Sequence, residues 1–341
     1  MLRNLHIKIH SRSRLYPIKI LAEDILTMKI LVTGGAGFIG SHLVEHALRR
    51  GDTVGVLDDF NDYYSPSIKE SNLAAVTGRI TLHRVDLGEQ TAVKKLVKEG
   101  GYDTIVHLAA RAGVRPSMQQ PELYLDTNIK GTFNMLEAAR EAGVKRFVFA
   151  SSSSVYGASP VVPFSEDQPL SQTLSPYAAT KLAGETICSN YAYLYGIRVV
   201  CLRFFTVYGP RQRPDLAIHQ FTRKIDQGIA IDQFGDGSTQ RDYTYIDDII
   251  QGIQGAIDYQ GELFDIFNLG ESETTTLAEL IARIEESVGK KALIHHLPEQ
   301  LGDMPRTFAN IDKARRLLGY RPTTSISEGI PKFVAWYRSL S

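Results

Sequence analysis

The chain has 341 residues, of which 43% are hydrophobic and 22% charged, and its formal net charge is zero. This length and composition indicate a globular protein with one large domain or two closely packed ones. Equal numbers of basic and acidic residues, 38 of each, argue against a protein built mainly to bind nucleic acid. No apolar run of about 18 residues occurs, so we expect no membrane-spanning helix.

Residues 1–27 differ in composition from the rest of the chain. Basic residues outnumber acidic ones there, and polar residues interrupt every apolar stretch. A secretory signal needs a continuous apolar stretch, so we do not expect one. Because an apolar strand follows Met28 directly, we expect the fold to begin there and residues 1–27 to form a disordered N-terminal extension or an upstream start. An organelle transit peptide is the alternative.

Short apolar runs alternate with segments of helical periodicity between Met28 and Leu202. The runs predict strands at 30–33, 53–57, 80–85, 104–108, 146–150 and 198–202. The segments between them predict helices at 38–50, 66–77, 89–99, 121–142 and 176–195. This alternation indicates an α/β fold of Rossmann type, with a doubly wound parallel sheet. After Phe204 the pattern becomes irregular, and long polar loops at 209–214 and 234–242 suggest a functional role.

A glycine-rich turn lies between the first predicted strand and the first predicted helix. Gly34, Gly37 and Gly40 form the pattern G-x-x-G-x-x-G, a variant of the dinucleotide-binding fingerprint. Glycines there permit a tight turn and a close approach of the backbone to pyrophosphate, which the helix N-terminus faces. Asp58 ends the second strand, where an acidic side chain binds ribose hydroxyls and repels a 2′-phosphate, so we expect NAD rather than NADP. Asp86 follows the third strand, where a side chain can meet the adenine.

Tyr177 and Lys181 lie four residues apart at the start of a predicted helix, and this spacing puts both side chains on one face. A serine run, residues 151–154, follows the fifth strand at the edge where open α/β sheets bind ligands. A tyrosine base working at neutral pH needs its pKa lowered from near 10 by up to about three units, or about 4 kcal/mol. A nearby ammonium group and the positive nicotinamide can share that shift.

These residue types suggest distinct catalytic roles. We expect Tyr177 to accept the proton of a substrate hydroxyl and Ser152 to hydrogen-bond the same hydroxyl. We expect Lys181 to lower the pKa of the tyrosine and to hold the nicotinamide ribose. The alternative is that Tyr177 and Lys181 are only a surface pair on a helix, because a motif this short also occurs by chance.

The chain from Met28 to its C-terminus resembles the extended short-chain dehydrogenase/reductase family, and within it the nucleotide-sugar 4-epimerases. The resemblance rests on motifs at 33–40, 107–110, 151–157, 203–210, 234–242 and 268–270, together with the Tyr177/Lys181 pair. It implies tightly bound NAD in a Rossmann domain formed by 28–203 and 236–268. It also implies a smaller α/β C-terminal lobe, formed by 204–235 and 269–341, that binds a UDP-sugar.

The resemblance extends to individual residues. The expected cofactor-binding residues are Gly34, Gly37, Phe38, Ile39, Gly40, Asp58, Asn61, Asp86, Leu87, Leu108, Ala109, Ala110, Asn128, Tyr177 and Lys181. The expected substrate-binding residues are Ser152, Ser153, Ser154, Thr206, Arg213, Arg241 and Asp303. Among these, Arg241 would pair with the diphosphate and Asp303 would contact the nucleotide ribose.

Three segments, 58–64, 112–115 and 206–215, resemble the UDP-glucuronate 4-epimerases in particular. Dehydratases of the family carry Asp-Glu, and decarboxylases Ser-Glu, where this chain has Ser153 and Ser154, so the resemblance leaves oxidation and reduction at one carbon. In the glucuronate enzymes the arginine that matches Arg213 reaches the sugar carboxylate together with Thr206, a pairing that suits a planar guanidinium. The resemblance thus implies conversion of UDP-glucuronate to UDP-galacturonate through a transient 4-keto intermediate.

Several alternatives stay open. The substrate could be UDP-glucose or a UDP-N-acetylhexosamine. Decarboxylation of UDP-glucuronate is a less favoured alternative. Arg211 and Arg213 could instead hold the diphosphate or face solvent, and Arg111, where these epimerases often have Gln, changes the contacts near the nicotinamide. A non-catalytic NAD-sensing protein would use the same fold, although the intact catalytic set argues against it.

Assembly and compartment are expectations of the same kind. The helices predicted at 121–142 and 176–195 match those that pair in family dimers, so the resemblance implies a homodimer. The two cysteines, Cys188 and Cys201, offer neither a disulfide framework nor zinc-type spacing. We therefore expect a cytoplasmic protein without a metal site.

Overall fold

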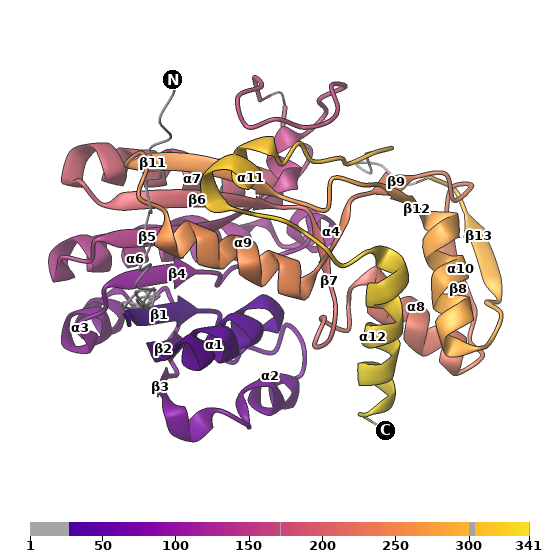
Figure 1. The fold of residues 1–341 in the computed structure, drawn as a ribbon, viewed down its shortest axis with the longest axis horizontal. Helices are drawn as coiled ribbons and strands as arrows, with labels where there is room; N and C mark the ends of the chain where they lie inside the picture. Colours follow the sequence, from indigo (N-terminus) through magenta and orange to yellow (C-terminus); the bar gives the residue numbers. More distant parts are fainter. Residues whose placement is uncertain (1–26, 171, 300–303, 341) are drawn as a thin grey trace, which may run out of the picture.

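The computed structural model of the chain describes residues 27–170, 172–299 and 304–340. Its larger part is built on a parallel sheet of seven strands in the order β11-β6-β5-β4-β1-β2-β3 (Figure 1). The strands are β1 (Lys29–Thr33), β2 (Thr53–Leu57), β3 (Ile80–His83), β4 (Thr104–His107), β5 (Arg146–Ser152), β6 (Arg198–Phe204) and β11 (Phe264–Leu269). This sheet confirms the predicted Rossmann-type fold. Except for Thr27, the predicted N-terminal extension lies outside the described residues.

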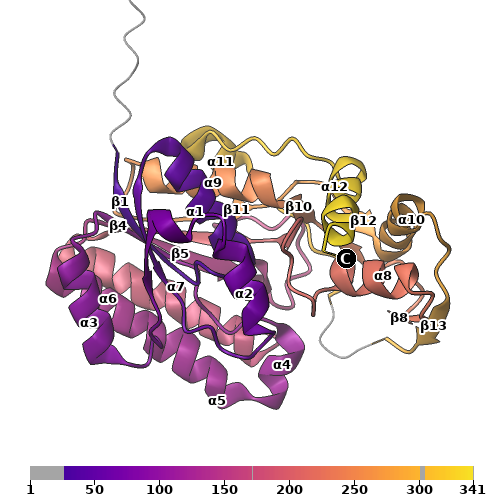
Figure 2. The same cartoon turned by 90° about the horizontal axis from the view of Figure 1, so that it is seen from below.

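Helices cover both faces of the sheet, as Figures 1 and 2 show. One face carries α3 (Gln90–Gly100), α6 (Gly131–Ala142) and α7 (Pro176–Tyr195), and the other carries α1 (Phe38–Arg50), α9 (Ile246–Asp258) and α11 (Asp312–Leu318). Alternate residues of β1 therefore enter different cores: Ile30 and Val32 pack on one side and Leu31 on the other, all fully buried. Shorter helices at the edges are α2 (Pro66–Leu73), α4 (Val114–Gln119) and α5 (Pro121–Tyr124).

A smaller lobe lies beside the sheet in both views (Figures 1 and 2). Its helices are α8 (Ala217–Asp226), α10 (Leu277–Val288) and α12 (Ile326–Arg338). Its strands form three short pairs: β7 (Thr206–Tyr208) with β10 (Tyr243–Tyr245), β8 (Ile231–Phe234) with β13 (Ile294–Leu297), and β9 (Gln240–Arg241) with β12 (Thr275–Thr276). Between these elements the chain returns to the sheet to add α9 and β11, which explains the irregular pattern after Phe204. None of the described helices is long and apolar enough to cross a membrane.

The segment predicted as a helix at 121–142 is helical throughout, but it is not a single regular α-helix. The structure divides it into α5, a π-helical segment η2 (Leu125–Lys130) and α6. Single π-turns inside helices often mark functional sites, and η2 carries two residues that bear on the cavity described below, Thr127 and Asn128. The predicted helix at 66–77 also ends earlier, at Leu73, and is followed by a 3₁₀ turn, η1 (Thr77–Arg79).

Asp242, from the 234–242 motif, joins segments of the smaller lobe. Its buried carboxylate accepts hydrogen bonds from the backbone N–H groups of Glu271 (2.7 Å), Ser272 (3.1 Å) and Ala309 (3.1 Å). Burial raises the pKa of Asp242 to about 6, although these hydrogen bonds oppose the shift. The motif thus includes a structural carboxylate.

Glu271 beside this carboxylate should make stability depend on pH. Burial, followed by the charges of Asp248 and Asp242, raises the pKa of Glu271 to about 8. A carboxyl whose pKa is raised by folding stabilises the fold while it is protonated, and this contribution is lost as pH rises through about 8. Glu271→Gln should therefore raise the melting temperature more at pH 9 than at pH 5. Glu286→Gln, on an exposed side chain of α10, serves as the control and should change it little at either pH.

Candidate active site

A cavity of about 360 Å³ opens at the carboxyl ends of the sheet strands. Its walls come from the turns that follow β1 to β6 and from the start of α7. Most residues predicted to bind cofactor or substrate line it: Gly34, Gly37, Phe38, Ile39, Gly40, Asp58, Asn61, Asp86, Leu87, Leu108, Ala109, Ala110, Ser152, Tyr177, Lys181, Thr206 and Arg213. Segments far apart in the sequence thus meet in one space.

The glycine turn at one end of the cavity has little room for side chains. Gly34 has a φ of +67°, and the N–H of Gly37 donates to its carbonyl oxygen at 3.0 Å. A Cβ at Gly40 would lie 2.1 Å from that same oxygen, which real Cβ atoms do not approach. No side chain caps the N-terminus of α1 at Gly37, so the first N–H groups of this helix stay available to an anion.

We expect Gly40→Ala to damage both the fold and the cavity. The added methyl group must displace the backbone of Gly34, and overpacking of this kind lowers the free energy of unfolding by about 1–3 kcal/mol. Urea unfolding would measure the loss, and the nicotinamide nucleotide that purifies with the protein should fall with it. Gly78→Ala is the matched control because nothing lies within 4 Å of its added Cβ. Equal effects of the two substitutions would contradict this account of the turn.

Asp58 closes the turn from the second strand. Its buried carboxylate accepts hydrogen bonds from the N–H groups of Ala36 (3.1 Å) and Phe60 (3.0 Å). Burial raises the pKa of Asp58, and the Lys69 ammonium, 3.7 Å from Oδ1, opposes this shift. Lys69 is itself buried and donates to the carbonyl of Asn61 at 3.0 Å, so it ties the loop after β2 to the carboxylate.

Tyr177, Lys181 and Ser152 meet in the same cavity. The Lys181 ammonium is buried, donates to the carbonyl of Ala150 at 2.8 Å and lies 6.0 Å from the centre of the Tyr177 ring. Burial lowers the pKa of Lys181 to about 8. Burial also raises the pKa of Tyr177, while a hydrogen bond with Ser152 and the charge of Arg213 lower it. The net shift is upward because burial outweighs the other influences, so the lowering expected from the sequence is not seen, and the groups that oppose burial are Ser152 and Arg213.

A buried polar network supports the serine run from behind. The hydroxyl of Ser151 donates to Glu185 at 2.5 Å, and Glu185 accepts two hydrogen bonds from Arg203, at 2.9 and 2.8 Å. Arg203 and Glu185 are 2% and 3% exposed, so each is a charge that needs its partner. The network joins β5, β6 and α7 directly beneath Ser152, which fixes the catalytic strand end against the helix that carries Tyr177.

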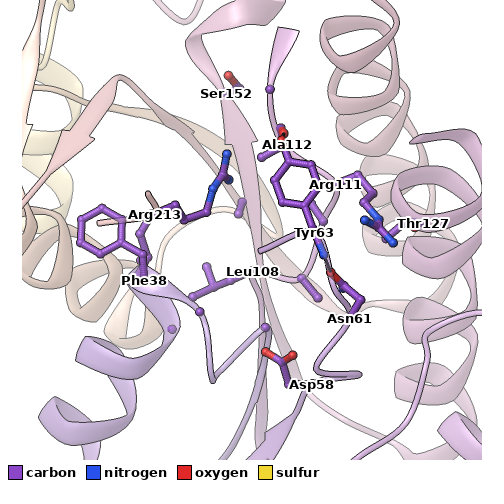
Figure 3. Close-up of a pocket in the computed structure, with 18 of the residues that line it drawn as sticks. Phe38, Asp58, Asn61, Tyr63, Leu108, Arg111, Ala112, Thr127, Ser152 and Arg213 are labelled. Atoms are coloured by element: carbon purple, nitrogen blue, oxygen red, sulfur yellow. Dashed lines mark hydrogen bonds between the residues drawn. The ribbon is translucent and has the colours of Figure 1, made fainter. Parts of the chain in front are cut away.

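Arg213 enters the cavity from the loop after β7, between Phe38 and Tyr63 (Figure 3). Its Cζ lies 5.3 Å from the centre of the Tyr63 ring. The Tyr63 hydroxyl donates to the carbonyl of Ala112 at 3.0 Å, and Tyr124 donates to the same oxygen at 3.1 Å. Neighbouring Arg211 points elsewhere, because its Nη2 donates to Glu45 on α1 at 2.5 Å. The two arginines therefore differ in position: Arg213 lines the cavity, whereas Arg211 pairs with α1.

Some predicted site residues do not line the cavity. Asn128 is buried beneath it, where its side chain bonds both the N–H (2.8 Å) and the carbonyl (2.9 Å) of Arg111, so it fixes a wall of the cavity rather than facing it. Ser153 and Ser154 lie in a 3₁₀ segment, η3 (Ser153–Tyr156), and are not among the residues that line the cavity. Arg241 lies outside, with Nη1 donating to the carbonyl of Gln240. Asp303 lies outside the described residues.

Sequence reasoning also misses residues that line the cavity. Among them are Asp59, Tyr63, Tyr64, Lys69, Thr127, Phe204 and Phe205. The resemblance of segment 58–64 is a signal for the two tyrosines, whereas nothing in the sequence points to Lys69. Among the described residues, no group of three or more His, Cys, Asp or Glu side chains could hold a metal ion.

Comparisons with known proteins agree with this geometry. The family model described as GDP-mannose 4,6 dehydratase matches residues 31–333. UDP-glucuronate 4-epimerase 3 of Arabidopsis thaliana is 42% identical over 327 residues, which cover 90% of this chain and 76% of the plant protein. Protein CapI of Staphylococcus aureus is 40% identical over 328 residues, covering 91% of this chain and 98% of that protein.

Solved structures of nucleotide-sugar 4-epimerases also match the chain. The UDP-glucuronic acid 4-epimerase of Bacillus cereus in complex with UDP-glucuronic acid and NAD matches with a TM-score of 0.87 at 37% identity, covering 92% of this chain and 100% of that one. The UDP-glucose 4-epimerase of Thermus thermophilus in complex with NAD matches with a TM-score of 0.84 at 34% identity, with the same coverage. The resemblance to nucleotide-sugar 4-epimerases is thereby confirmed, and the chain belongs to the GDP-mannose 4,6 dehydratase family, together with the UDP-glucuronate 4-epimerases.

Proposed function

We propose that this protein is an isomerase that interconverts UDP-glucuronate and UDP-galacturonate at C4, with NAD as its cofactor. The observation that carries the proposal is the shared cavity, in which the glycine turn, the Tyr177/Lys181/Ser152 set and Arg213 face one space. The relatives named UDP-glucuronate 4-epimerase and the Bacillus cereus complex with UDP-glucuronic acid and NAD support it.

The residues present fit NAD at the glycine end of the cavity. The glycine turn leaves no side chains between the pyrophosphate position and the uncapped N–H groups at the start of α1. Asp58 places a carboxylate at the end of β2. We assign the remaining contacts to Asn61, Asp86, Leu87, Leu108, Ala109 and Ala110, which line the same end, with Tyr177 and Lys181 near the nicotinamide. When bound, NAD supplies an acceptor for the hydrogen at C4 and returns it to the sugar.

The protein's own groups would move the proton. Tyr177 accepts the proton of the C4 hydroxyl as the sugar becomes a 4-keto sugar, and returns it after the ring has turned its other face. Ser152 hydrogen-bonds the same oxygen and holds it near the phenol. Lys181, buried and bonded to the carbonyl of Ala150, supplies a positive charge beside the ring of Tyr177. The bond to Ala150 uses one of the three N–H donors of this ammonium, and the others are available to hold the nicotinamide ribose.

Arg213 gives the site its preference for an acidic sugar. Arg213 lines the cavity, as Thr206 does, and a planar fork of N–H groups binds a carboxylate more firmly than a neutral hydroxymethyl group. Arg241 and Asp303 stay predicted contacts to the diphosphate and the nucleotide ribose, and Ser153 and Ser154 stay predicted contacts to the sugar. In this scheme residues 28–203 and 236–268 form the NAD domain, and 204–235 and 269–341 form the UDP-sugar lobe.

We also propose a homodimer through the helices on the α7 face of the sheet. Large apolar side chains are exposed on α4, η2, α6 and the end of α7, including Met118, Leu125, Phe133, Tyr193 and Leu194. The helices that carry them lie together in Figure 2. An exposed apolar surface of this kind is typical of an interface. A cytoplasmic location stays a prediction, supported by two free cysteines that are buried without forming a disulfide.

A substrate comparison tests the proposed activity. Purified protein should convert UDP-glucuronate to UDP-galacturonate, resolved by chromatography and mass spectrometry, faster than it converts UDP-glucose or UDP-N-acetylglucosamine. A preference for either neutral sugar would assign the chain to another UDP-sugar 4-epimerase, and release of CO₂ as the main outcome would assign it to a decarboxylase. Binding of NAD without any conversion would favour the non-catalytic NAD-sensing protein.

A further inference from the structure

One edge of the Arg213 guanidinium is already occupied within the protein. Nε donates to Oδ1 of Asp215 at 2.9 Å, and Nη2 donates to Oδ2 at 2.7 Å. Two parallel hydrogen bonds of this kind fix both the distance and the plane of the group. A guanidinium has five N–H donors, so a second edge, formed by Nη1 and Nη2, stays available for another carboxylate.

The two members of this pair lie on different sides of the cavity wall. Arg213 lines the cavity and its side chain is 17% exposed, whereas Asp215 does not line it and its side chain is 39% exposed. Asp215 therefore binds the guanidinium from the solvent side. A carboxylate that competed for the substrate position would lie inside the cavity instead.

An aromatic ring also lies beside the guanidinium. The ring of Tyr63 lies against it, with Cζ 5.3 Å from the ring centre, and the Tyr63 hydroxyl is anchored to the carbonyl of Ala112. Figure 3 shows Arg213 beside Tyr63 and directed toward the end of the cavity that holds Ser152. Because the two parallel hydrogen bonds to Asp215 fix the guanidinium plane, the remaining edge has a defined direction.

We propose that Asp215 is a positioning residue for the substrate carboxylate: it holds the Nε edge of Arg213 so that the Nη1 edge is presented to a uronate in the cavity. This inference rests on the proposed function. A substrate carboxylate pairs with Arg213 without displacing Asp215, and the guanidinium then bridges two carboxylates, one from the protein and one from the sugar.

The chemistry of the 4-keto sugar makes this orientation measurable. A carboxylate on C5 beside a C4 carbonyl is a β-keto acid. When the C5–C6 bond aligns with the carbonyl π system, that bond breaks, its electron pair forms the enolate at C4, CO₂ leaves, and the enolate takes a proton at C5. Each 4-keto-pentose that is released would leave one NAD reduced to NADH, because the hydride is not returned to it, so the assay includes added NAD. An arginine of fixed direction holds the carboxylate away from this alignment, whereas a loose arginine does not.

The test compares product partition in Asp215→Asn and Asp215→Glu with that of the unaltered protein. Asp215→Asn removes the charge and one acceptor but leaves an amide oxygen that can still accept from Arg213, so the fraction of UDP-glucuronate released as 4-keto-pentose and CO₂ should rise by about three- to tenfold, the size of the net contribution of one ordinary hydrogen bond. Asp215→Glu keeps a carboxylate and should restore part of the original partition. UDP-glucose, which has no carboxylate to lose, should give no such product with any of the variants.

Glu45→Gln is the matched control. It breaks the ion pair of Arg211, two residues from Arg213 in the same loop, and Glu45 does not line the cavity, so the partition should stay as it was. If Asp215→Asn lowers the KM for UDP-glucuronate and leaves the partition unchanged, Asp215 competes with the substrate and the positioning role is wrong. If the unaltered protein does not convert UDP-glucuronate, the proposed function itself fails. This outcome is distinct from a failure of the positioning role, which shows only in the variants.

Discussion

Tyr177→Phe should abolish nearly all turnover while the protein keeps its NAD. The substitution preserves the ring, which packs edge-on against Tyr124 at 6.2 Å between ring centres, and removes only the hydroxyl. Without it, no group at that position accepts the C4 proton, and general acid–base catalysis contributes about 10²–10⁴-fold. Initial rates with UDP-glucuronate, and NAD released on denaturing the purified protein, would measure the two effects separately.

A second variant distinguishes the role of the base from damage to the helix. Thr186→Ala lies on the same helix, and its hydroxyl bonds only within that helix, to the carbonyl of Leu182. It should leave the rate within about twofold, since exposed substitutions change stability by less than about 0.5 kcal/mol. If Tyr177→Phe kept a rate within a factor of about ten of the unaltered enzyme, the assignment of Tyr177 as the base would be withdrawn.

Arg213→Ala should change what the enzyme makes as well as how fast. Charge-assisted pairing of a carboxylate contributes about 1.5–3 kcal/mol, which biases decarboxylation by about ten- to a hundredfold. We therefore expect slower turnover of UDP-glucuronate and a larger fraction released as 4-keto-pentose and CO₂. Mass spectrometry of the products would give the partition. Because Arg213 also helps to lower the pKa of Tyr177, the rate optimum should move to higher pH in this variant.

UDP-glucose is the control substrate for Arg213→Ala. It lacks the carboxylate, so its turnover should decrease only to the extent that loss of Arg213 raises the pKa of Tyr177. Normal epimerisation of UDP-glucuronate by the variant, with no additional CO₂, would show that Arg213 does not hold the carboxylate. The preference for an acidic sugar would then lack its main physical support.

Local chemistry explains which elements the sequence predicts well. Both ends of helix α7 are predictable because Ser175 caps the N-terminus by accepting from the N–H of Ala178, Pro176 occupies the first turn, and Gly196 ends the helix at a φ of +67°. The strands β1 and β2 are predicted closely because both faces of the sheet are buried, which leaves continuous apolar runs.

Contacts between distant segments explain what the sequence could not provide. The π-helical turn η2 brings Asn128 to the backbone of Arg111, a partner 17 residues away, and helical periodicity carries no information about it. Lys69 stands in an ordinary helical pattern, yet it is buried against Asp58. The sequence predicts that the serine run faces the substrate throughout, but Ser152 accepts from the N–H of Ser154 and turns the chain after β5.

The balance of NAD during turnover tests the central claim most directly. An epimerase returns the hydrogen that it removes. Reactions started from UDP-glucuronate or from UDP-galacturonate should therefore reach the same mixture without added NAD, and the absorbance of NADH should not rise. Parallel chromatography would count the product formed. In a parallel reaction supplied with NAD, steady formation of one NADH for each sugar converted would show a net oxidation at C4 and contradict the epimerase assignment.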